Sequence, residues 1–170
     1  SQASYVTVII AWGRSSDPNL FQHVEELLER YKVAVDGGFI TNPRSPNVYN
    51  AALSVCRFNA ESEKLRDQAL GTLFATLEQL RKGTQAKPDQ FTYLTVLEAL
   101  DRLMVDDSLE ERNEAFDREF SNCISDGLVS PKIVGVIYSA TPQLFEKLFG
   151  QGKTPSSAEI PKSWLKGLRI

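Results

Sequence analysis

The strongest constraint in this chain is a repeat with a period of 44 residues. Tyr5, Tyr49 and Tyr93 are each 44 positions apart, and each stands near the start of an apolar stretch. A polar break and then a longer amphipathic stretch follow each of these openings. Self-similarity at a fixed period of about 20 to 50 residues is typical of repeat proteins, in which stacked units share a continuous core. The repeat therefore predicts a stack of similar units.

Each unit is predicted to be a pair of helices. Apolar residues at spacings of three and four, such as Leu73, Leu77 and Leu80, place one apolar stripe on each long stretch. Start signals precede the stretches, including Asp17-Pro18, Ser45-Pro46 and a Ser108–Glu111 capping box. Together these signals predict helices over residues 4–13, 18–32, 46–58, 62–82, 89–104 and 108–127, with two short helices starting near 130 and 141.

The predicted fold class is all-α, because no stretch alternates apolar and polar residues as a half-buried strand does. A single hairpin cannot bury both of its faces, whereas stacked hairpins can. We therefore expect an α-solenoid of three to four antiparallel helical hairpins over residues 1–149. Residues 150–170 are rich in Pro, Gly and Ser and are expected to form an extended basic and apolar tail. Its Trp164, Leu165 and Leu168 must bury against the body of the protein or against a partner.

The charge is close to balanced overall but uneven along the chain. There are 19 Lys and Arg and 22 Asp and Glu, a net charge of −3, which disfavours binding of nucleic acid by bulk positive charge. Residues 91–149 hold 11 acidic and five basic side chains, whereas the tail is basic. Because the first residues lack a Met and Tyr5 already lies inside an element, we expect a chain cut from a longer one.

The residue inventory predicts no enzyme. The chain has one His, His23, and two Cys, Cys56 and Cys123, too few for a Cys/His zinc cluster or a disulfide framework. We expect no catalytic residue, metal, cofactor or small-molecule substrate. Residues 150–154, Gly-Gln-Gly-Lys-Thr, look like part of a phosphate-binding loop, but Lys147 stands where the motif needs Gly and Pro155 follows where a helix should start, so no nucleotide site is expected. No run of about 18 apolar residues is present, so no membrane span is expected.

Three stretches in one register resemble the pentatricopeptide repeat family, in a degenerate form with lengthened repeats. That family ends each repeat in Pro-Asp and opens the next with a short helix that contains Thr-Tyr. The matching stretches are Lys87-Pro88-Asp89-Gln90-Phe91-Thr92-Tyr93, Ser45-Pro46-Asn47-Val48-Tyr49-Asn50 and Ala3-Ser4-Tyr5-Val6-Thr7.

The resemblance implies a superhelix of helical hairpins in a mitochondrion or chloroplast, and it leaves two functions open. The first is a protein-interaction or structural subunit of a larger complex, with Trp164, Leu165 and Leu168 as docking residues. The alternative is a single-stranded RNA-binding protein of organelle RNA processing or translation. The family reads a base largely with the residue after the Tyr, and Val6 and Leu94 cannot hydrogen-bond a base edge. The RNA-binding candidates are Asn50, Arg57, Lys87 and Gln90.

Overall fold

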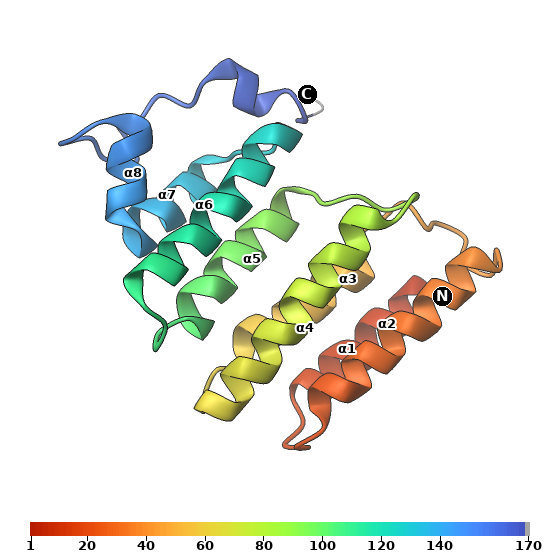
Figure 1. Ribbon diagram of the computed structural model, residues 1–170. Coiled ribbons are helices and arrows are strands. Elements are labelled where there is room, and N and C mark those ends of the chain that lie inside the picture. The colour runs from red at the N-terminus through yellow and green to blue at the C-terminus, as the bar shows by residue number, and fades with distance from the viewer. Residues whose placement is uncertain (169–170) are drawn as a thin grey trace. The chain divides into compact units, whose positions relative to one another are not determined.

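The computed structural model describes residues 1–168, and the last two residues of the chain lie outside the described part. Residues 1–168 form eight α-helices, one short 3-10 helix and no strand, so the predicted all-α class is confirmed (Figure 1). No helix in this range is both long and apolar enough to cross a bilayer.

The chain divides into two compact units, Ser1–Pro88 and Asp89–Ile170. The division lies between the fourth and fifth helices. The domain boundary that the sequence suggests at residue 149 stays a prediction.

The first unit is arranged around one buried helix. Its four helices are α1 (Gln2–Gly13), α2 (Leu20–Asp36), α3 (Asn47–Phe58) and α4 (Glu63–Lys82). Helix α3 packs against the other three, while α2 also packs against α1 and α4. From Val48 to Cys56 every side chain of α3 except that of Ser54 is buried, which makes α3 the core of this unit.

Small residues let α1 approach α3 closely. Gly13 of α1 lies against Val55 of α3, and a Cβ at Gly13 would be 2.5 Å from Val55 Cγ2. The side-chain amide of Asn59 donates to the carbonyls of Gly13, at 3.2 Å, and Val55, at 2.8 Å. The ends of α1 and α3 are thereby joined through both packing and hydrogen bonds.

The second unit contains α5 (Gln90–Leu103), α6 (Leu109–Asp126), α7 (Pro131–Ala140), α8 (Pro142–Phe149) and the 3-10 helix η1 (Lys162–Leu165). Helix α5 packs against α6 and α7, and α8 packs against α7. The hydroxyl of Tyr93 on α5 donates to the Asp126 carboxylate at 2.5 Å, at the end of α6. Burial of apolar residues on α5, α6 and α7 forms the core of this unit.

Most of the predicted helix starts are confirmed. The side chains of Ser62, Asp89, Ser108 and Ser130 each accept a hydrogen bond from a backbone N–H of the following turn. Ser108 and Glu111 form the predicted capping box.

The predicted start of the second helix is wrong. Asp17 accepts from the N–H of Asn19 at 2.7 Å and so closes a turn before the helix, which begins at Leu20. Helix α2 also runs to Asp36, past the predicted end at Lys32, and Gly38, in the left-handed region at φ 75°, follows its end.

Residues 150–168 return to the body of the second unit. The Trp164 ring lies edge-on to Phe120 and Phe149, with a centroid separation of 5.8 Å in each case. The backbone carbonyl of Trp164 accepts from the N–H of Val129 at 3.2 Å, and η1 packs against α6. Leu165 and Leu168 are half-buried.

Two glycines allow this return. Gly127 ends α6 in the left-handed region, at φ 72°, and its carbonyl accepts from the N–H of Gly167 at 3.0 Å. A Cβ at Gly127 would be 2.4 Å from the backbone nitrogen of Gly167, and a Cβ at Gly167 would be 2.1 Å from the carbonyl oxygen of Asp126. Backbone atoms cannot move aside as a flexible side chain can, so both positions require glycine.

Gly127→Ala is predicted to release residues 162–168 from α6. The left-handed backbone costs alanine about 1–2 kcal/mol, and the clash with Gly167 adds to that cost. Gly152→Ala is the matched control, because Gly152 has nearly the same φ, 74°, and open space around its Cβ. In urea unfolding, Gly127→Ala should lose more free energy of unfolding than Gly152→Ala. In a Trp12→Phe background, Gly127→Ala should also shift the emission of Trp164 to the red. Equal losses for the two variants would contradict the packing described.

Candidate functional site

The predicted RNA-binding residues do not form one exposed set. Asn50 is only 5% exposed on α3, and Arg57 lies later on the same helix with its guanidinium 4.4 Å from the Phe58 ring centroid. Lys87 is exposed, and its ammonium donates to the Gly83 carbonyl at 2.6 Å. The Gln90 amide donates to the carbonyl of Leu128 at 3.3 Å. All four side chains are therefore buried or engaged with the chain itself.

The predicted docking residues of the tail, Trp164, Leu165 and Leu168, are half-buried. Trp164 contacts Phe120 and Phe149, as described above. Of the two alternatives that the sequence leaves open, the body of the protein or a partner, the structure places this ring on the body.

The exposed side of α1 is uncharged over its whole length. Helix α1 contains no Asp, Glu, Lys or Arg, yet Val8 is 42% and Ile10 is 37% exposed. We define the α1 face as the exposed residues Ala3, Ser4, Thr7, Val8, Ile10 and Ala11. Exposed helix surfaces in water normally carry charged residues opposite their apolar stripe, and α1 departs from that pattern.

The 44-residue period relates the α1 face to buried residues of α3. Ser4, Thr7, Val8 and Ala11 correspond to Val48, Ala51, Ala52 and Val55. All four residues of the second set are buried, and Val55 contacts Gly13 of α1. Thr92, Thr95, Val96 and Ala99 are the equivalents on α5 and are again small or β-branched. In the first two repeats, one sequence pattern therefore lies at a helix contact in α3 and faces solvent in α1.

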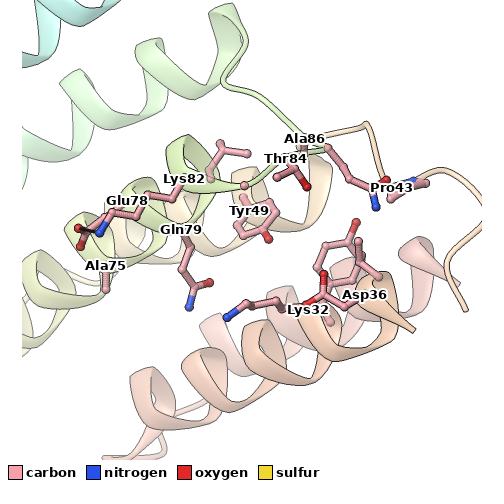
Figure 2. Close-up of a pocket in the computed structure, with 15 residues that line it drawn as sticks. Lys32, Asp36, Pro43, Tyr49, Ala75, Glu78, Gln79, Lys82, Thr84 and Ala86 are labelled. Carbon is pink, nitrogen blue, oxygen red and sulfur yellow. Dashed lines mark hydrogen bonds and ion pairs between the residues drawn. The ribbon is translucent and has the colours of Figure 1, made fainter. Parts of the chain in front are cut away.

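A groove opens in the first unit between the C-terminal halves of α2 and α4. Its volume is about 420 Å³. Tyr49, in the first turn of α3, lies between the two helices, and residues 83–86 and Pro43 close one end (Figure 2). Burial of the Tyr49 hydroxyl raises its pKa, and the neighbouring Tyr31 raises it further. Tyr49 is therefore a neutral phenol at pH 7 and can donate a hydrogen bond.

One polar atom of this groove lacks a partner. The side-chain oxygen of Gln79 is buried, and it accepts no hydrogen bond from residues 1–168. A buried acceptor without a partner costs about 1–3 kcal/mol of desolvation. Sequence reasoning missed this groove, because its residues come from three helices and two connections that no local pattern brings together.

The remaining candidate groups of the sequence have structural surroundings. The ring of His23 on α2 stacks on the ring of Trp12 on α1, at a centroid separation of 4.0 Å. Cys56 and Cys123 are both buried free thiols. No group of three His, Cys, Asp or Glu side chains within residues 1–168 is placed to hold a metal ion.

Comparison with protein-family models, with curated proteins and with solved structures finds no match to this chain.

Both thiols are predicted to be unreactive while the protein is folded. Burial raises the pKa of Cys123 to about 12 and raises that of Cys56 further, so neither forms the nucleophilic thiolate at pH 8. Labelling with a disulfide reagent at pH 8 should modify neither thiol in buffer and both in urea. Because the folded state favours the neutral thiols, the free energy of unfolding should fall as pH rises above about 9. Rapid labelling of the native protein would contradict this account.

Proposed function

We propose that this chain is a non-enzymatic helical-repeat module that acts by binding another protein. In this proposal the helices form an α-solenoid of antiparallel hairpins of the pentatricopeptide type, and the module is a subunit of a mitochondrial or chloroplast assembly. The α1 face is the observation that carries the protein-binding function. An uncharged face with exposed Val8 and Ile10 lacks the charged side chains that a helix surface in permanent contact with water normally carries.

The 44-residue register of the repeat supports both the proposed solenoid and the proposed partner surface, which is a helix. In α3, the equivalents of four of the six α1-face residues are buried, and one of them, Val55, lies against the glycine of a neighbouring helix. Small and β-branched side chains at these positions allow close approach of two helices. The partner surface that fits the α1 face is therefore another helix with an uncharged face and a small residue at the closest point.

The geometry favours this function over single-stranded RNA binding. A base reader must present polar atoms to a base edge, but Asn50 is buried. The amide of Gln90 is engaged with the carbonyl of Leu128. The acidic composition of residues 91–149 also opposes the attraction of phosphates.

Val8→Arg is predicted to abolish partner binding without unfolding the protein. The substitution places a charge in the centre of the α1 face, and central apolar contacts dominate interface energies. Tagged protein should capture specific partners from an extract of mitochondria or chloroplasts, and Val8→Arg should reduce their recovery by about tenfold or more. Gln143→Arg is the matched control, because Gln143 is exposed on α8 of the other unit.

Two outcomes of the capture experiment would overturn the proposal. In the first, wild-type protein and Val8→Arg recover the same proteins in the same amounts. In the second, nuclease treatment removes the captured material, which would show that RNA mediates the association. The melting temperature of Val8→Arg should stay close to that of the wild type, because Val8 is exposed.

Single-stranded RNA is predicted not to bind at physiological salt. Fluorescence anisotropy with a labelled 20-nucleotide RNA should show no saturation at about 0.15 M salt, where screening weakens contacts with phosphate. Weak binding at low salt should disappear as salt is raised. Saturable binding that Lys87→Ala or Asn50→Ala weakens at 0.15 M salt would favour the RNA-binding alternative.

A further inference from the structure

Helix α1 is apolar on every side. Ile9 is fully buried, and Tyr5 and Trp12 are half-buried, while Val8 and Ile10 are exposed. A helix that is hydrophobic all round is normally enclosed on all sides. Packing within the first unit covers only one side of α1, so the opposite side, the α1 face, is left for a further helix.

Helix α8 shows what an uncovered helix side in this chain looks like. Its exposed residues include Gln143, Glu146 and Lys147, so the outer side of α8 is polar and charged. Stacked helical repeats need such a polar outer face wherever the stack ends. The α1 face carries no charged residue and lacks this property, which indicates that another helix covers it.

The contact between α1 and α3 shows how one helix covers such a face. At one end, the Gln2 amide at the start of α1 donates to the carbonyl of Ser45, just before α3, at 3.3 Å. At the other end, Gly13 lies against Val55, and the Gly13 carbonyl accepts from Asn59, just after α3. Helices α1 and α3 therefore run in the same direction, with their starts together and their ends together.

The 44-residue period transfers this arrangement to the α1 face. Val55, which meets Gly13, corresponds to Ala11, and Val48 near the start of α3 corresponds to Ser4. Ala11 and Ser4 are both smaller than their valine equivalents. A helix at the same distance from α1 therefore has room for alanine or serine at the point where α1 itself needs glycine.

We propose that the α1 face binds a helix of a partner protein that runs parallel to α1, in the register in which α1 packs on α3, with a glycine, alanine or serine opposite Ala11. This inference rests on the proposed function for the identity of the surface, and it adds the direction and register of the bound helix. A charged residue opposite Ala11 would be buried without a counter-charge, because α1 contains none.

The probe for this proposal is the chain's own first helix pair. A second copy of residues 1–44 is fused before Ser1, so that the two copies of α1 are spaced as α1 and α3 are. We expect one cooperative urea transition with a higher midpoint than that of the original chain, because the added copy buries the α1 face of the original one. A separate transition for the added copy, or an unchanged midpoint, would contradict the proposal.

One substitution made in two places assigns the effect to the α1 face. Val8→Arg in the original copy of α1 should remove the rise in midpoint, because this residue then lies between the two copies. Val8→Arg in the added copy should keep the rise, because this residue faces solvent as Val8 does in the original chain. Equal effects of the two substitutions would overturn the proposal.

Two cysteine pairs test the direction of the added helix. Gly13→Cys in the added copy and Ala11→Cys in the original copy should form a disulfide, because a Cβ at Gly13 would lie 3.2 Å from the Val55 Cβ in the equivalent contact. Gly13→Cys with Ser4→Cys is the matched control and should stay reduced, since Ser4 lies about two helical turns from Ala11. A disulfide in the control pair, or in neither pair, would overturn the parallel register.

A second copy of the chain is the competing occupant of an uncharged face. Light scattering of the original chain should give the mass of a monomer. A dimer that Val8→Arg dissociates would assign the α1 face to self-association and overturn the proposal.

The proposed function and this inference fail in different ways. Loss of partner capture in Val8→Arg, without stabilisation by the added copy, would support protein binding at the α1 face and overturn the parallel register. Stabilisation by the added copy, with capture that Val8→Arg leaves unchanged, would overturn the proposed function and support the register of helix packing on α1.

Discussion

The close contact between α1 and α3 is the constraint on which the first unit depends. Helix α3 is buried along almost its whole length and touches each of the other three helices of the unit. Where α1 meets α3, Gly13 leaves room for the side chain of Val55. With α3 enclosed, the side of α1 that faces away from it has no neighbour within the unit. The α1 face is thus a direct result of the packing that forms the core.

Local signals explain why the helices could be predicted from the sequence. Apolar spacing and caps such as Ser62, Asp89 and Ser108 act within one or two turns, so they can be recognised without knowing the fold. The wrong helix start predicted at Asp17 has the same local origin. An Asp carboxylate can cap either a turn or a helix, and the sequence does not distinguish the two. The all-α class follows from these signals.

The candidate sites depend on long-range packing, and sequence reasoning located them less well. Asn50 follows one of the repeated tyrosines and is a candidate for base contact, but the enclosure of α3 buries it. The groove requires the ends of α2 and α4 to separate around Tyr49, and no periodicity encodes that separation. The α1 face had a detectable signal, the lack of any charged residue from Gln2 to Gly13. That signal could be interpreted only once the structure showed which side of α1 faces solvent.

The glycine pair at the end of α6 has a consequence for how sequences of this fold can diverge. Gly127 and Gly167 are 40 positions apart in the chain, but each occupies the space that a side chain on the other segment would need. A side chain added at one of them cannot be accommodated by any substitution at the other, since main-chain atoms form both contacts. Variation at the two sites should therefore be correlated: relatives that keep the docked tail retain both glycines, and those that lose the tail are free to change both.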